Sequence, residues 1–75
     1  MHSLPSLKAT QIIRALKKAG FIEDRQKGSQ LVLINPHKNA RTVIPIHAGK
    51  DIKKPLVRAI IHDTQLTVED FLDLL

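Results

Sequence analysis

Residues 21–46 read FIEDRQKGSQLVLINPHKNARTVIPI, and this stretch decides the fold. Its clearest element is Gln30–Ile34, a run that is mostly aliphatic and has the length of a buried strand. Turn-forming residues lie on both sides of it, with Gly and Ser in 26–29 and Asn and Pro in 35–39. The sequence therefore predicts a strand bounded by two turns.

Two weaker β segments flank this strand. Phe21–Arg25 precedes the first turn, and Arg41–Ile46 follows the second with several β-branched residues. Because the connections are short, we expect neighbouring antiparallel strands. Proline cannot donate a hydrogen bond to a neighbouring strand, so Pro45 predicts an edge position or the end of its strand.

Helical patterns stand on both sides of the strands. From Ser6 to Ala19 apolar residues recur at intervals of three and four, which predicts an amphipathic helix ended by Gly20. A second helix is expected over Lys53–Asp63, with Pro55 near its start, where a missing amide proton costs least. Thr67, followed by two acidic residues, resembles the capped start of a last short helix.

The expected fold class is therefore α+β. The predicted order is α-β-β-β-α with a terminal helical turn, and the helices should lie on one face of a three-stranded antiparallel sheet. We expect a single domain over residues 1–75, because no linker, repeat or low-complexity stretch interrupts the chain. Residues Ala48–Asp51 are expected to form a loop before the second helix.

The composition excludes several classes of protein. There is no cysteine, which removes disulfide bridges, thiolate metal sites and thiol catalysis. Residues Met1–Pro5 lack the pattern of a signal peptide, and no apolar stretch approaches the roughly 18 residues of a membrane span. The four histidines and seven acidic residues show no metal-ligand spacing. We expect a cytoplasmic protein that needs no metal or other cofactor and contacts no membrane.

Positive charge is concentrated in one continuous segment. Residues 1–58 hold all 12 lysines and arginines, whereas 59–75 carry four of the seven acidic residues and neither lysine nor arginine. With a pI of about 10.0, this pattern is typical of a nucleic-acid-binding protein; a basic surface that serves only solubility is the alternative. Only Phe21 and Phe71 are aromatic, which argues against a platform of stacked bases.

Several segments together resemble one known family. They are Lys27-Gly28-Ser29, Ile44-Pro45-Ile46-His47, the run Gly49–Lys54 leading into Leu56–Ile61, and the ending Leu66–Phe71. As a set they resemble the HicA (YcfA-like) family over nearly the whole chain. The resemblance implies a fold similar to double-stranded RNA-binding domains, and a toxin that cleaves mRNA without a metal and is silenced by a partner antitoxin, HicB.

At one position the sequence differs from that family. The family usually has a histidine after the glycine-containing turn, taken to be catalytic, where this chain has Gln30. Metal-free RNA cleavage needs a group that takes the proton from the 2′-hydroxyl as it attacks the neighbouring phosphate. Imidazole suits this role because it titrates near neutral pH, whereas an amide does not. We therefore expect Gln30 to donate hydrogen bonds, and cleavage to be impaired.

His47 is the second candidate catalytic residue. By alternation it should face the same way as Val43 and Pro45, while Gln30 faces with Val32 on the adjacent strand. If the register of the strands suits, the side chains at positions 30 and 47 approach each other. His47 could then bind phosphate or supply an acid or base; otherwise it is a polar residue that ends a strand.

Basic residues form the candidate RNA-binding set. Lys27 beside Gly28 and Ser29 could bind a phosphate together with backbone amides of the turn, or the three could form an ordinary hairpin turn. A second group surrounds the start of the second expected helix, where it could contact an RNA backbone or form a solvated charged face. This group consists of Lys50, Lys53, Lys54 and Arg58.

Three interpretations of the function stay open at this point. The first is a HicA-like mRNA endoribonuclease scaffold with position 30 as its catalytic point. The second is a non-catalytic double-stranded RNA-binding module to which Gln30 is native. The third is a protein whose basic face serves mainly an acidic antitoxin. The last leucines of the chain close the core or extend to a partner or a second copy, which would give a weak homo-oligomer.

Overall fold

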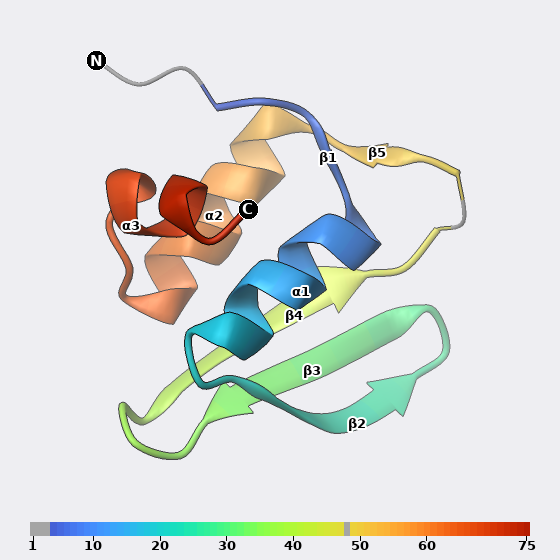
Figure 1. Ribbon diagram of the computed structural model, residues 1–75. Coiled ribbons are helices and arrows are strands. Elements are labelled where there is room, and N and C mark those ends of the chain that lie inside the picture. Colours follow the sequence, from blue (N-terminus) through green and yellow to red (C-terminus); the bar gives the residue numbers. More distant parts are fainter. Residues whose placement is uncertain (1–3, 48) are drawn as a thin grey trace.

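A computed structural model describes residues 4–47 and 49–75 of the chain (Figure 1). The first three residues, and Ala48 of the expected loop, lie outside the described residues. In chain order the elements are β1 (Leu7–Lys8), α1 (Ala9–Lys18), β2 (Ile22–Lys27), β3 (Gln30–Asn35), β4 (Ala40–Pro45), β5 (Asp51–Ile52), α2 (Lys54–Thr64) and α3 (Val68–Asp73).

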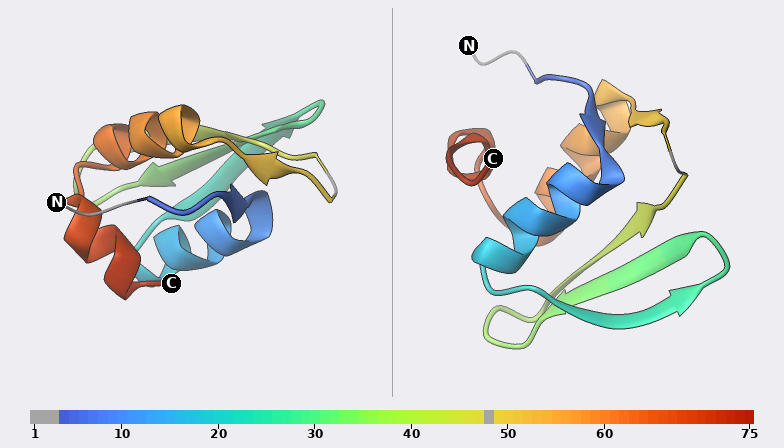
Figure 2. Two further views of the ribbon diagram at one scale, coloured as in Figure 1. Left: turned by 90° about the horizontal axis from the view of Figure 1, so that it is seen from above. Right: turned by 45° about the vertical axis from the view of Figure 1, so that its right-hand side comes forward.

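The main sheet is three-stranded and antiparallel, in the order β2-β3-β4. The helices and the short strands β1 and β5 lie on one side of it, and no described helix or strand covers its other face (Figures 1 and 2). The expected α+β class, with helices on one face of a three-stranded sheet, is confirmed.

A second sheet of two strands was not predicted. β1 pairs antiparallel with β5, so that Leu7 lies opposite Ile52 and Lys8 opposite Asp51. An ion pair of 3.3 Å between Lys8 Nζ and Asp51 Oδ1 joins the same strands. Asp51 is therefore a strand residue, and its assignment to the loop was wrong.

Helix α1 begins later than its apolar pattern predicts. It starts at Ala9 rather than Ser6, because the residues before it are extended and Leu7 pairs with β5. The Gln11 side chain accepts a hydrogen bond of 2.9 Å from the Lys8 backbone N–H, which satisfies one free donor at the helix start.

The register of β3 fixes the geometry of the sheet. Gln30 lies opposite Lys27 of β2 and opposite Pro45 of β4. β2 extends to Lys27, two residues beyond the expected strand, so that only Gly28 and Ser29 remain in the turn. Pro45 is the last residue of an edge strand, as its missing N–H predicts.

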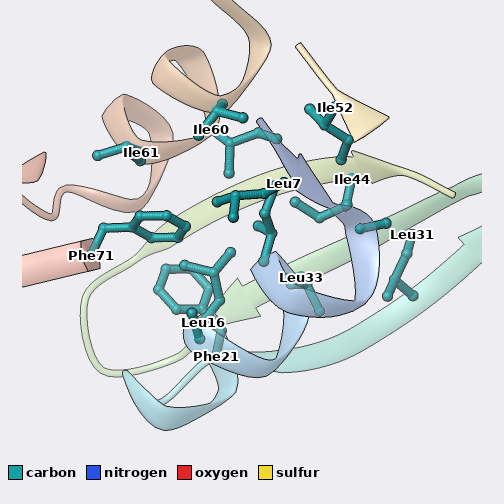
Figure 3. Packing of buried hydrophobic residues seen from close by; sticks show 14 of the residues in the cluster. Leu7, Leu16, Phe21, Leu31, Leu33, Ile44, Ile52, Ile60, Ile61 and Phe71 are labelled. Carbon is teal, nitrogen blue, oxygen red and sulfur yellow. The ribbon is translucent and has the colours of Figure 1, made fainter. Parts of the chain in front are cut away.

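The core lies between the sheet and the helices. Leu31 and Leu33 of β3 pack there with Ile44 of β4, Leu16 of α1 and Phe71 of α3, as Figure 3 shows. None of these residues is more than 4% exposed. The expected stripe of α2 is buried in the same cluster: Val57, Ile60 and Ile61.

The starts of the last two helices also follow the expectation. α2 has Pro55 in its first turn. α3 follows Thr67, whose hydroxyl accepts a hydrogen bond of 3.0 Å from the Asp70 N–H. None of the described helices is long and apolar enough to cross a membrane.

A buried asparagine joins the end of α1 to the sheet. Asn35 is 3% exposed. Its Nδ2 donates a hydrogen bond of 3.2 Å to the Ala19 carbonyl, and its Oδ1 accepts one of 3.0 Å from the His37 N–H. Gly20 has a φ of +98°, and a Cβ there would lie 3.4 Å from Asn35 Nδ2. Glycine therefore suits this corner because of its backbone conformation, since a Cβ there would meet Asn35 only in ordinary van der Waals contact.

Replacing this asparagine should destabilise the fold. We expect Asn35→Ala to lower the free energy of unfolding by about 1–3 kcal/mol, because a carbonyl and an N–H lose their partner in a partly buried place. Urea denaturation followed by circular dichroism measures the change. His37→Ala is the matched control, since His37 takes part through its backbone alone. Equal free energies for the two variants would contradict this role of Asn35.

Candidate functional site

The turn between β2 and β3 lies at the same end of the molecule as the end of β4 (Figure 1). Gly28 has a φ of +61°. It is the first residue of a two-residue hairpin loop, a position where type II′ turns need glycine. The Ser29 carbonyl accepts a hydrogen bond of 2.6 Å from the Ile46 N–H. The tip of the hairpin is thereby tied to the residue that precedes His47.

Gln30 is the first residue of β3, and His47 lies two residues beyond the end of the neighbouring strand β4. Gln30 pairs with Pro45, and His47 lies two residues further along the chain. Lys27 flanks position 30 from the other side, and all three side chains are exposed. The register therefore places Gln30 opposite a residue close to His47 in the chain, while the approach of the two side chains and their catalytic roles stay predictions.

A cavity of about 450 Å³ opens beside His47, between the end of β4 and the start of α2. Its volume falls in the range of about 300–1,000 Å³ that is typical of small-molecule sites. Most of its wall is apolar. The residues that line it are Pro45, His47, Lys50, Asp51, Ile52, Lys53, Pro55 and Leu56.

The structure separates the predicted cations of this region into two groups. Lys50 and Lys53 line the cavity together with His47. Lys54 and Arg58 are exposed and lie one turn apart on α2, outside the cavity wall. Their predicted contacts with RNA therefore fall on two adjacent surfaces rather than one.

Sequence reasoning missed the apolar walls of the cavity. It assigned Pro45 and Pro55 to strand and helix ends and gave no role to Ile52 or Leu56. One signal was available, because Leu56 directly follows the proline at the helix start and stands outside the buried stripe of α2. Leu56 is 41% exposed in the structure.

Some of the other charges of the chain are used within the fold, and others lie at the opposite end of the molecule. On α1, Lys17 forms an ion pair of 2.6 Å with Glu23, and Lys18 donates a hydrogen bond of 3.0 Å to the Leu74 carbonyl. The acidic residues beyond Arg58 lie on the second half of α2 and on α3, at the end opposite the hairpin tip (Figures 1 and 2). The exposed positive charge near Gln30 and His47 therefore faces no acidic cluster from α3.

A further feature is the arrangement of the side chains that could bind a metal ion. Within residues 4–47 and 49–75, no three His, Asp or Glu side chains come together as a group that could hold a metal ion.

The fold and the site define a class: a small basic α+β domain whose exposed cations surround a glycine turn and the start of a helix. The chain belongs to the HicA toxin family, since the family model described as HicA toxin of bacterial toxin-antitoxin matches residues 9–66, most of its length. The resemblance inferred from the motifs is thus confirmed. A toxin of such a system has an antitoxin as its partner. The comparison with curated proteins finds no match.

Replacing the glycine of the turn should destabilise the protein more than replacing its neighbour, Ser29. We expect Gly28→Ala to lower the free energy of unfolding by about 1 kcal/mol, because alanine is strained at a positive φ. Ser29→Ala in the same loop, where φ is not positive, should leave the free energy nearly unchanged. Thermal or urea unfolding compares the two, and equal losses would rule out a turn that depends on glycine at position 28.

Proposed function

We propose that the chain is the RNA-binding endoribonuclease scaffold of a toxin–antitoxin pair and that it acts on mRNA in the cytoplasm. The proposal is supported by one arrangement within a HicA-family chain. The Gly28–Ser29 turn, position 30 and His47 lie at one basic end of the molecule. The partner we propose is a HicB-like antitoxin.

The reaction begins at the 2′-hydroxyl of a nucleotide. Its oxygen attacks the neighbouring phosphorus, a base takes its proton, and an acid protonates the 5′-oxygen that leaves. The products are a 2′,3′-cyclic phosphate and a free 5′-hydroxyl. The base and the acid account for both protons, so the step needs no further reactant. Each proton transfer by a positioned side chain contributes about 10²–10⁴ in rate.

Gln30 can perform only part of this chemistry. Its amide can donate a hydrogen bond to a phosphate oxygen, but it cannot take the proton near neutral pH. His47 supplies an imidazole just beyond the end of the neighbouring strand and is the candidate for the remaining proton transfer. In this proposal the chain combines its RNA-binding cations with an incomplete pair of proton-transfer groups.

RNA binding is assigned to the cations around this point. Lys27 lies beside the turn, Lys50 and Lys53 line the cavity, and Lys54 and Arg58 extend the positive surface along α2. Contacts with phosphates position an RNA strand without reading its sequence.

One observation favours a second function. Gln30 at the family's histidine position is what a non-catalytic double-stranded RNA-binding module would carry, with shape-selective contact as its whole activity. Such a module binds RNA and cuts none, even after Gln30→His.

A histidine at position 30 should increase the rate of RNA cleavage. We expect Gln30→His to raise the rate of mRNA cleavage in EDTA by about 10²–10⁴ over the unchanged chain, because it returns a group that can take the 2′-hydroxyl proton. The measurement is a time course of a purified mRNA on a gel. His47→Ala, made both in the unchanged chain and in the Gln30→His variant, tests the second imidazole and should lower the rate of cleavage in each.

Two other outcomes would change the assignment. If the unchanged chain already cuts and His47→Ala stops it, His47 carries the proton transfer and position 30 is not the impaired point. If neither the unchanged chain nor the Gln30→His variant cuts while both bind RNA, the binding module replaces the enzyme.

Binding should depend on salt through the assigned cations. We expect Lys53→Ala to weaken RNA binding and to reduce the slope of log affinity against log salt by about 1, because one phosphate contact is lost. Fluorescence anisotropy over a salt series measures the slope. Arg14→Ala, on the exposed side of α1, removes the same charge away from the site and should leave the slope unchanged. Equal slopes for both variants would refute the assignment.

A further inference from the structure

The cavity beside His47 has mostly apolar walls, which combine a buried residue, Ile52, with an exposed one, Leu56. Pro45, Ile52, Pro55 and Leu56 contribute side chains that form no hydrogen bonds. Leu56 is 41% exposed, so packing of the core does not account for its place there. Rigid proline rings beside an exposed leucine offer the kind of surface against which a flat uncharged group packs well.

The charged residues of the cavity determine which group enters it. Lys50 and Lys53 are exposed and favour an anion. Asp51 also lines the cavity, and its carboxylate is shared with Lys8 at 3.3 Å. A phosphate deep in the cavity would meet this carboxylate and the apolar walls. An anion therefore fits beside Lys50 and Lys53, and an uncharged group fits inside the cavity.

We propose that the cavity binds one unpaired base of single-stranded RNA, while Lys50 and Lys53 hold the phosphates next to that base. The inference rests on the proposed function and narrows its substrate. An RNA duplex keeps its bases paired and stacked inside the helix, and its major groove is too deep and narrow for side chains to reach them. Bases of single strands can turn outward and pack against a protein. The aromatic platform that the composition argues against is replaced here by proline and leucine surfaces.

The position of His47 connects the base to the chemistry. His47 lines the cavity and also lies two residues beyond the partner of Gln30. A base held in the cavity therefore belongs to a nucleotide next to the phosphate at positions 30 and 47. Holding that base outside a helix also allows in-line attack, in which the 2′-oxygen approaches the phosphorus opposite the leaving 5′-oxygen. A-form geometry prevents this alignment. This link to the cleavage point favours RNA over an apolar segment of a protein.

The test compares RNA strands with and without bases. The probes are a fluorescent single-stranded hexaribonucleotide, the same sugar–phosphate chain with its bases removed, and a duplex of the hexamer. Their binding to the unchanged chain is measured by anisotropy at low salt. We expect the intact single strand to bind about three- to tenfold more tightly than the abasic strand, because it buries additional apolar surface.

Variants assign that difference to the cavity. Leu56→Ala should remove most of the advantage of the intact strand and leave the abasic strand unchanged, whereas Lys53→Ala should weaken both. Ile22→Ala is the matched control, since Ile22 is an exposed aliphatic residue on the main sheet, outside the cavity. Circular dichroism verifies that each variant is folded; Leu56 stands outside the buried stripe, so truncating it leaves the core intact.

The outcomes separate this inference from the proposed function. Equal affinity for intact and abasic strands, or tighter binding of the duplex, overturns the base site and leaves RNA binding standing. Absence of binding to every RNA at low salt overturns the proposed function as well. If Leu56→Ala weakens binding of the antitoxin but not of the single strand, the cavity holds a protein segment and the inference is wrong.

Discussion

Strand β3 pairs with β2 along one edge and with β4 along the other, and its register determines where the side chains of the site lie. Because side chains alternate along a strand, Leu31 and Leu33 face the helices while Gln30 faces the opposite side. A slip of one residue would bury Gln30 and expose the leucines, which apolar burial opposes. The position where the family carries its histidine is therefore held on an accessible face by the packing of the core.

The small pair of strands β1 and β5 shapes the rest of the site. The exposed ion pair between Lys8 and Asp51 contributes about 0–1 kcal/mol, as surface pairs do. Leu7 and Ile52, at 4% and 6% exposed, contribute more, since burying each such side chain is worth about 1.5–3 kcal/mol. Apolar burial rather than charge thus holds β5 in place. Because Asp51 and Ile52 line the cavity, the same burial forms its wall.

The positive charge of this chain and the residue at position 30 are separate features. The cations that remain exposed near the hairpin and at the start of α2 do not depend on the identity of residue 30, whereas the proposed proton transfer does. The family's usual imidazole is absent at Gln30, and the imidazole of His47 lies beyond the end of a different strand, β4. With this arrangement, the proposed binding of RNA does not depend on the histidine that the proposed cleavage needs.

Local patterns in the sequence determined much of the fold. They predicted the β3 strand from Gln30 onward, the edge position of Pro45, the cap at Thr67, the family and the departure from it at position 30. Each of these depends on neighbouring residues or on a motif, so no distant contact was needed. The tertiary structure alone decided the β1–β5 pairing, which joins Lys8 to a residue 43 positions away. It also decided the cavity, whose wall combines the end of β4 with the start of α2. A two-residue strand has no periodicity to detect, and a cavity exists only where separately folded elements pack against each other.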